Sequence, residues 1–233
     1  MTSMYTIILL ILVFVPFQEK EHAILSQNEE WIWLFNGSGT EHWKGVKSAD
    51  FPEKGWEIIG NELVENRDKA AGRGGDIITR EVYSSFDLQF EFKYTKGANG
   101  GIKYFVEFYP SGSVLGCEYQ IIDDQYNKDI QNDLDGKRLT ASLYELFEAE
   151  NKKLNPAGQW NSGRILVEGT HVEHWLNGAK VLEYERGSKA FMEAKAKSKF
   201  QDVEDFGTMD SGYIMLTDHG DQLAYRNIKI RKL

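Results

Sequence analysis

A strict alternation of polar and apolar side chains in the middle of the chain limits the folds open to it. From Asp87 to Tyr94 every second residue is apolar, beginning with Leu88 and continuing through Phe90 and Phe92. Successive side chains of a β-strand point to opposite faces, so this pattern predicts a strand with one buried face and one wet face.

Two hairpins are predicted from the residues that join such segments. Asn177-Gly178 separates two alternating segments, and Asn-Gly favours a tight type I′ turn between antiparallel strands. Residues 160–167 are expected to pair beside this hairpin. The glycine-containing turn at 96–101 leads from the 87–94 strand to a second strand at 102–108, and we expect these two strands to pair as a hairpin.

The remaining pattern favours an all-β fold. Strong helix formers predict one surface helix between Ser188 and Phe200, and the last strands are expected at 212–216 and 223–230. Many short strands, few helices and no βαβ alternation predict a jelly-roll β-sandwich of two antiparallel sheets with one or two short surface helices. A single domain over residues 28–233 is within the size range of one hydrophobic core.

The N-terminus carries a short apolar run from Ile7 to Phe17, broken only by Pro16. Its length is that of a signal-peptide core, so residues 1–27 are interpreted as a signal peptide with a linker, which predicts export to the periplasm or the outside. No Lys or Arg precedes the run and no small-residue cleavage site stands out. An uncleaved membrane anchor is therefore the alternative interpretation.

Charge and cysteine content exclude other classes. The formal net charge of -9 argues against nucleic acid as a partner, because that binding depends on clustered Lys and Arg. The single cysteine, Cys117, cannot form an intramolecular disulfide. No His/Asn pattern accompanies it, and we expect a buried, inert thiol.

The segment Glu118-Tyr-Gln-Ile-Ile-Asp123 is the most informative polar cluster. In a regular strand Glu118 and Gln120 share one face while Asp123 points to the other. A one-residue bulge between them would bring all three together, as bulges beside active sites often do. The alternative is a strand whose polar face simply meets water.

Asp218-His-Gly-Asp221 follows an apolar segment and forms the second cluster. An imidazole such as that of His219 titrates near neutral pH and is suited to proton transfer, while Asp218 and Asp221 would orient it or bind a cation. An ordinary polar turn between two strands is the competing interpretation. Glycine turns at 74–76 and 99–101 each carry one polar side chain.

Other motifs give little support for a different chemistry. His171 and His174 lie on the predicted hairpin and are interpreted as structural. The chain has no His-x-x-x-His or Cys-x-x-Cys metal spacing, no phosphate-binding glycine loop that opens a helix, and no Gly-x-Ser-x-Gly motif.

Taken in order, these segments resemble the 3-keto-disaccharide hydrolase family, whose fold is similar to that of concanavalin-A-like lectins and glucanases. The resemblance covers nearly the whole chain after the leader. The segments that carry it are Leu34-Phe-Asn-Gly37 with Trp43, Gly55-Trp-Glu57, Gly74-Gly-Asp-Ile-Ile-Thr79, Phe86-Asp-Leu-Gln-Phe-Glu-Phe92, Asn99-Gly-Gly-Ile102, Glu118-Tyr-Gln-Ile-Ile-Asp123, Ser142-Leu-Tyr144, Trp160-Asn161, Trp175-Leu-Asn-Gly178 and Asp218-His-Gly-Asp221 with Arg226-Asn-Ile228.

The resemblance implies cleavage of glycosides whose sugar is oxidised at C3, by loss of the C2 proton and elimination at C1, with water adding afterwards. Such chemistry needs a base, an acid and a group that stabilises the enolate. His219 is the first candidate for proton transfer and Glu118 the second. Lys103 and Arg226 are candidate electrostatic partners. The side chains that would hold the hydroxyl groups of an oligosaccharide or glycoside substrate are Asp76, Asn99, Gln120, Asp123 and Asp221. The alternative ligand for the same side chains is a divalent cation, which is the only cofactor considered.

Two other functions stay open at this point. One is a non-catalytic carbohydrate-binding module, because a lectin-like fold does not establish activity. The other is a conventional glucanase, which uses two carboxylates. Here Gln120, which cannot ionise, stands between Glu118 and Asp123, so the glucanase mechanism is less well supported.

Overall fold

The computed structural model describes residues 30–65, 73–131 and 135–233. The predicted leader and linker at residues 1–27 lie outside this part of the chain. Within it, no helix is both long enough and apolar enough to cross a membrane.

The chain forms two antiparallel sheets. The larger one contains β1 (Ile32–Phe35), β3 (Trp56–Ile59), β4 (Glu62–Glu65), β6 (Phe86–Tyr94), β9 (Asn161–Glu168), β10 (His171–Leu176), β11 (Ala179–Glu185) and β13 (Leu223–Lys232). The smaller one contains β2 (Trp43–Gly45), β5 (Ile77–Tyr83), β7 (Asn99–Phe108), β8 (Val114–Ile122) and β12 (Gly212–Leu216). The strand orders are β11-β10-β9-β6-β13-β4-β3, with β1 also on β13, and β2-β5-β12-β7-β8.

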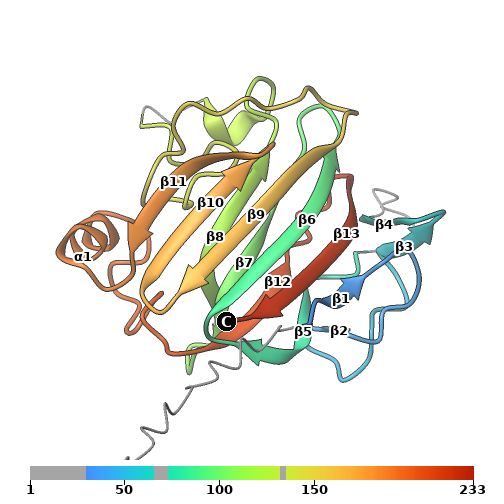
Figure 1. The fold of residues 1–233 in the computed structure, drawn as a ribbon, viewed down its shortest axis with the longest axis horizontal. Coiled ribbons are helices and arrows are strands. Elements are labelled where there is room, and N and C mark those ends of the chain that lie inside the picture. The colour runs from blue at the N-terminus through green and yellow to red at the C-terminus, as the bar shows by residue number, and fades with distance from the viewer. Residues whose placement is uncertain (1–29, 66–72, 132–134) are drawn as a thin grey trace, which may run out of the picture.

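Figure 1 shows the two sheets stacked, with β11, β10, β9, β6 and β13 in front of β8, β7, β12 and β5. This confirms the predicted jelly-roll sandwich. One helix, α1 (Lys189–Ala196), and one 3₁₀ turn, η1 (Lys128–Ile130), lie at the periphery. The helix begins where it was predicted, because the Ser188 hydroxyl caps its start by accepting a hydrogen bond from the Phe191 N–H, but it ends at Ala196 and so is shorter than the predicted range 188–200.

The hairpin at Asn177-Gly178 is confirmed. Both residues have positive φ, 49° and 81°, as a type I′ turn requires. The turn joins β10 to β11, and β9 pairs with β10 on the other side, as predicted.

The predicted hairpin between 87–94 and 102–108 is wrong. These residues lie on β6 and β7, which belong to different sheets, since β6 pairs with β9 and β13 while β7 pairs with β8 and β12. The two strands face each other across the core instead. Phe86 of β6 and Tyr104 of β7 meet edge to face, 6.4 Å between ring centres.

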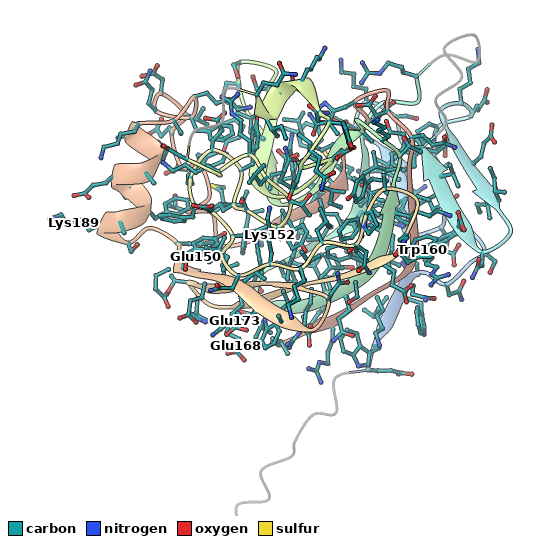
Figure 2. All side chains as sticks on the ribbon, turned by 90° about the horizontal axis from the view of Figure 1, so that it is seen from above. Glu150, Lys152, Trp160, Glu168, Glu173 and Lys189 are labelled. Carbon is teal, nitrogen blue, oxygen red and sulfur yellow. The ribbon has the colours of Figure 1, made fainter. Side chains whose placement is uncertain are left out.

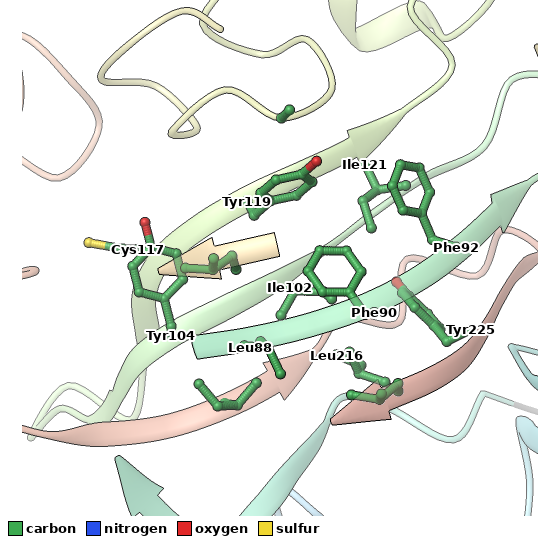
Figure 3. Close-up of a cluster of buried hydrophobic side chains, with 14 of the residues drawn as sticks. Leu88, Phe90, Phe92, Ile102, Tyr104, Cys117, Tyr119, Ile121, Leu216 and Tyr225 are labelled. Atoms are coloured by element: carbon green, nitrogen blue, oxygen red, sulfur yellow. The ribbon is translucent and has the colours of Figure 1, made fainter. Parts of the chain in front are cut away.

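The core lies between the sheets and is rich in aromatic rings, as Figure 3 shows. The alternating side chains of β6 predicted as its buried face are at most 3% exposed. Phe90 packs edge-on against Tyr119 of the opposite sheet, 5.4 Å between centres. Cys117 is fully buried, and burial raises the pKa of its thiol to about 12, as expected of an inert cysteine.

A polar chain crosses this core and contains His174, one of the two histidines predicted to be structural. His174 Nδ1 lies 2.8 Å from the Ala141 carbonyl oxygen, to which it donates. Its Nε2 then accepts from the Tyr104 hydroxyl at 2.8 Å, and Tyr104 is 2.5 Å from the Tyr184 hydroxyl. The neutral imidazole is therefore satisfied on both nitrogens.

Burial lowers the pKa of His174 from 6.5 to about 4, so acid should destabilise the fold. In the unfolded chain the His174 imidazole takes up a proton below pH 6.5, whereas in the folded chain it stays neutral down to about pH 4. We expect the free energy of unfolding to fall by about 3 kcal/mol from this group over that interval. Denaturant titrations at pH 7, 5.5 and 4.5 measure the loss, and His174→Gln should remove this part of the pH slope. An unchanged slope in the variant would contradict the assignment.

Candidate active site

Two predicted site residues lie side by side on the outer face of the five-stranded sheet. Lys103 on β7 is the Cα partner of Glu118 on β8 and of Met215 on β12. Their strand neighbours Ile102 and Tyr119 are fully buried in the sandwich, so Lys103 and Glu118 point to the other side. Lys103 Nζ is 3.9 Å from Glu118 Oε2.

The Glu118 side chain is held over a glycine. A Cβ placed on Gly101 would lie 2.5 Å from Glu118 Oε1, too close for any side chain. The carboxyl group therefore reaches from the Lys103 position towards Asn99, which shares this face two residues before Gly101. The predicted glycine turn at 99–101 is thus wrong: these residues belong to β7, and Gly101 is required by close packing rather than by a turn.

Two more side chains complete this cluster, and the sequence did not identify them. The Tyr144 N–H donates to the Glu118 carbonyl oxygen at 3.0 Å, which holds Tyr144 beside β8. Lys199 places its Nζ 4.2 Å from the centre of the Tyr144 ring. Burial raises the pKa of Tyr144 to about 12 and lowers the pKa of Lys199, which also feels the charges of Glu118 and Lys103.

An ion pair flanks the same cluster. Arg138 Nη2 is 2.8 Å from Glu145 Oε1, so the second nearby carboxylate is already engaged by a guanidinium. We call Lys103, Glu118, Tyr144 and Lys199 the Glu118 cluster. It combines one carboxylate with two ammonium groups.

The second predicted segment forms a polar pocket farther along the same strand. The pocket has a volume of about 360 Å³ and is lined by Gly97, Asn99, Tyr126, Asn127, Lys128, Asp129, His219 and Asp221. Three predicted residues, Asn99, His219 and Asp221, thus come together. Asn99 donates from its backbone N–H to Asp221 Oδ2 at 3.0 Å and from its side chain to Asp129 Oδ2 at 3.2 Å. Its buried Oδ1 accepts no hydrogen bond from the described residues.

The turn that carries His219 is fixed by carboxyl groups beneath it. Asp218 accepts from the Gly75 and Gly220 N–H groups at 2.7 and 2.8 Å. Asp76, another predicted residue, accepts from the Asp218 N–H at 2.7 Å. Asp76 therefore supports the turn and lines an adjoining pocket of about 450 Å³.

Glu65, at the end of β4, also supports the turn that carries His219. It is fully buried, and its Oε1 accepts from the Gly220 N–H at 2.9 Å. Burial, together with its hydrogen bond to Asp218, raises the pKa of Glu65 to about 10. Burial of Asp218 acts to raise its pKa. The pKa is nevertheless lowered, because the Asp218 carboxylate accepts hydrogen bonds from Glu65, Gly75 and Gly220. Glu65 is thus protonated at neutral pH and donates to the Asp218 carboxylate.

The bulge that would bring Glu118, Gln120 and Asp123 to one face is absent from β8. β7 and β8 pair without a register shift from Asn99 and Ile122 to Tyr104 and Cys117. Gln120 therefore stays on the face of Glu118, although it is 2% exposed.

Asp123 lies away from the Glu118 cluster. Its carboxylate accepts from the N–H groups of Gly97, Gln125 and Tyr126 and closes the turn after β6. This position does not bring it to the face shared by Glu118 and Gln120.

Arg226 lies on the other sheet. It is on β13, its Nη2 is 2.6 Å from Glu91 Oε2, and its guanidinium stacks over Trp160 at 4.1 Å. The structure therefore does not bring Arg226 to the Glu118 cluster. A pocket lined in part by Trp33 and Trp175 lies on this same sheet.

Among the described residues, one group of three has ligand atoms close enough for a metal ion: His171, Glu173 and Glu183. It lies on β10 and β11 of the larger sheet, where Figure 2 shows Glu173 pointing away from the molecule. Lys180 forms ion pairs with both carboxylates. The predicted cation ligands around His219 stay a prediction.

Comparison with known proteins places the chain in a family. A sequence model of the family described as the 3-keto-alpha-glucoside-1,2-lyase-like domain matches residues 30–231. The chain belongs to this family. The resemblance seen in the sequence is therefore confirmed.

A relative of the chain from Bacteroides thetaiotaomicron is named 3-keto-disaccharide hydrolase. It is 30% identical over 228 residues, which are 87% of this chain and 78% of the relative. Membership in the family and this relative assign the chain a glycosyl hydrolase-like function.

Crystal structures give the same result. A protein of Parabacteroides distasonis, provisionally named a glycosyl hydrolase, superposes with a TM-score of 0.78 at 30% identity, covering 88% of this chain and 95% of its own. A second protein of that organism with the same provisional name gives 0.63 at 26% identity, covering 88% and 100%. A β-agarase B bound to agaro-octaose, at 10% identity and a TM-score of 0.50, shares only the fold, over 82% of this chain and 85% of its own.

Proposed function

We propose that the protein cleaves glycosides whose sugar carries a ketone at C3, by elimination across C1 and C2. The observation that carries this proposal is the composition of the Glu118 cluster, where one carboxylate is accompanied by the ammonium groups of Lys103 and Lys199. The cluster lies on the same sheet face as Asn99, which lines the His219 pocket.

The two parts of the site follow one another along β7. Lys103 and Asn99 are four residues apart on β7, about 13 Å along the strand. The Glu118 carboxyl lies over Gly101, between them. A ring bound beside Glu118 extends along β7 towards Asn99 and the pocket that contains His219.

The reaction follows from the acidity of a C–H bond next to a ketone. His219 removes the C2 proton, and the C–H electron pair forms the C2=C3 double bond of an enolate with charge on the C3 oxygen. When that pair returns to form C1=C2, the C1–O bond breaks, and Glu118 in its acid form protonates the leaving oxygen. Water then adds to the unsaturated ketone at C1, which gives net hydrolysis.

Lys103 and Lys199 stabilise the negative charge that develops on oxygen in these steps. A retaining glycosidase, in contrast, needs two carboxyl groups about 5 Å apart. The position beside Glu118 on this face is held by Gln120, and Glu145 is paired with Arg138. The arrangement therefore supports elimination over conventional glycosidase chemistry.

Exchange of the C2 hydrogen tests the assignment of His219. We expect the wild type to exchange the C2 hydrogen of a 3-keto-glucoside with D₂O and to show a primary isotope effect on cleavage of the C2-deuterated substrate. His219→Ala should lower both exchange and cleavage 10²- to 10⁴-fold, because general base catalysis contributes that much. NMR of the substrate and mass analysis of the products measure the two rates.

His42→Ala serves as the matched control, because His42 lies outside the His219 pocket. Cleavage without any isotope effect, or His219→Ala with wild-type exchange, would contradict the proposal.

A further inference from the structure

A row of side chains crosses the outer face of the larger sheet and has a tryptophan at each end. Cα pairing connects its members in the order Trp33 on β1, Lys229 on β13, Gln89 on β6, Arg164 on β9 and Trp175 on β10. Each of them has a strand neighbour that is buried between the sheets, so all five side chains point away from the core.

A hollow of about 600 Å³ lies over this row. Its lining includes all five members of the row, and we call it the indole groove. Trp33 is 44% exposed at one end, which is unusual for an indole in a chain whose other large rings mostly lie in the core. A hollow of this size that is lined by aromatic and polar side chains is typical of a small-molecule site.

The two indoles are spaced for a ligand of several units. The row spans five adjacent strands, which lie about 4.8 Å apart, so the Cα atoms of Trp33 and Trp175 are separated by about 19 Å. This span is longer than one pyranose ring and fits a short oligosaccharide laid across the strands.

The indole groove is separate from the Glu118 cluster. In Figure 1 the strands β10, β9, β6 and β13 form the front layer, and β7 and β8, which carry Lys103 and Glu118, lie behind them. The outer faces of the two sheets point in opposite directions, because the core lies between the sheets. A ligand in the groove therefore does not reach the proposed catalytic groups.

The Trp175 end of the groove is held in place before any ligand binds. The Trp175 Nε1–H donates to Glu173 Oε2 at 2.7 Å, and the Arg164 guanidinium lies 5.4 Å from the centre of the ring. Arg164 is itself held by Asp87, to which its Nε and Nη2 donate at 2.7 and 3.0 Å. The indole therefore loses little freedom when a ligand stacks on it.

The charges around the groove are compensated within the protein. Asp87 neutralises Arg164. Glu91, which also lines the groove, accepts from Arg226 at 2.6 Å and from the Asn227 side chain at 2.9 Å. A polyanion needs a cluster of free cations, so an uncharged ligand matches this surface better.

The remaining lining suits the two kinds of surface that a sugar presents. The C–H face of a pyranose ring stacks on an indole, and both ends of the row offer one. Between them, the Gln89 amide and the Ser162 hydroxyl both donate and accept hydrogen bonds, as sugar hydroxyl groups require.

We propose that the indole groove is a non-catalytic binding site for a neutral oligosaccharide, which stacks on Trp33 and Trp175 and lies across five strands. The site is distinct from the proposed reaction centre and does not depend on it. It would hold the protein on a glycan while the opposite face of the sandwich meets the substrate.

Unoxidised tetrasaccharides test the groove, because they lack the ketone that the proposed reaction requires. We expect at least one of cellotetraose, maltotetraose and laminaritetraose to bind in isothermal titration calorimetry, and glucose to bind at least about tenfold more weakly. Trp33→Ala and Trp175→Ala should each weaken tetrasaccharide binding about tenfold, since one aromatic contact contributes on the order of one decade. Phe108→Ala, which removes a comparably exposed ring from the five-stranded sheet, should leave binding unchanged.

Activity gives a second measurement on the same variant. Trp33 is exposed, so its replacement leaves the core intact, and Trp33→Ala should cleave the methyl 3-keto-glucoside with a kcat/KM within about twofold of the wild type. A parallel loss of activity and binding would show that the two sites are not separate, and would overturn the proposal.

Three other outcomes would also overturn the proposal. The first is binding of none of the three tetrasaccharides, or binding that neither tryptophan variant weakens. The second is tighter binding of tetragalacturonate that disappears at high salt, which would identify a site for polyanions. The third is a dimer in sedimentation that Trp33→Ala dissociates, which would show that a second copy of the chain occupies the groove.

Discussion

Glu118→Gln is expected to lower kcat/KM for an alkyl 3-keto-glucoside about 10³-fold. Glutamine keeps the shape of Glu118 and its position over Gly101, but it cannot supply a proton to the leaving oxygen. The loss follows from the usual contribution of a general acid, 10²- to 10⁴-fold. Steady-state kinetics on the methyl 3-keto-glucoside measures it.

The leaving group identifies the role of Glu118. A nitrophenolate leaves without help from an acid, so Glu118→Gln should retain most of its activity on the nitrophenyl 3-keto-glucoside, and exchange of the C2 hydrogen should continue. Glu107→Gln, which changes a carboxylate on the neighbouring strand β7, is the matched control. Equal losses on both substrates would show that Glu118 does not act as the acid, and wild-type activity on the alkyl substrate would remove it from the mechanism.

The fold could be predicted as far as local signals reach. Alternation correctly identified the buried face of β6, and Asn177-Gly178 correctly identified a hairpin, because both depend on neighbours in sequence. The partner of β6 was not predictable in this way. A turn of a few residues after Tyr94 can either reverse the chain within one sheet or lead it across the sandwich edge, and the glycines at 97, 100 and 101 fit both.

Those glycines also show where sequence interpretation failed at the site. Glycine permits positive φ, and only Gly97 among the three uses it. Gly100 and Gly101 are needed because a Cβ would contact Leu223 and Glu118. Close approach between distant segments leaves no local pattern in a single sequence.

The candidate site was predicted in part for the same reason. Lys103 and Glu118 meet because the antiparallel pairing of β7 and β8 places them opposite each other. The strand pattern of the sequence can indicate such a pairing. Tyr144 and Lys199 come from irregular segments whose path depends on tertiary packing. Arg226 does not join them, because the strand that follows the His219 turn belongs to the other sheet.

Glu65 was missed because its segment reads as the end of an ordinary strand. Glu65 Oε2 has no hydrogen-bond partner among the described residues when the carboxyl groups of Glu65 and Asp218 are both ionised. A proton on Glu65 supplies the missing donor towards Asp218, which agrees with the pKa raised to about 10 by burial and by Asp218. The turn carrying His219 thus rests on a neutral acid.

Glu65→Gln is therefore expected to stabilise the protein at neutral pH by about 3 kcal/mol. The unfolded chain releases the Glu65 proton above pH 4.5, while the folded chain keeps it up to about pH 10. This group consequently lowers the free energy of unfolding progressively as pH rises through that window. Glutamine carries no such proton, and it can still accept from the Gly220 N–H and donate to Asp218.

Denaturant unfolding of both proteins at pH 5, 7 and 8.5 measures the effect. The stability gained by Glu65→Gln should be small at pH 5 and should grow with pH, at about 1.4 kcal/mol per unit. Glu65→Leu should be less stable than the wild type at all three values, because it leaves the Gly220 N–H without its acceptor. A gain from glutamine that does not change with pH would show that Glu65 is ionised in the folded chain. The hydrogen bond to Asp218 would then need a different donor.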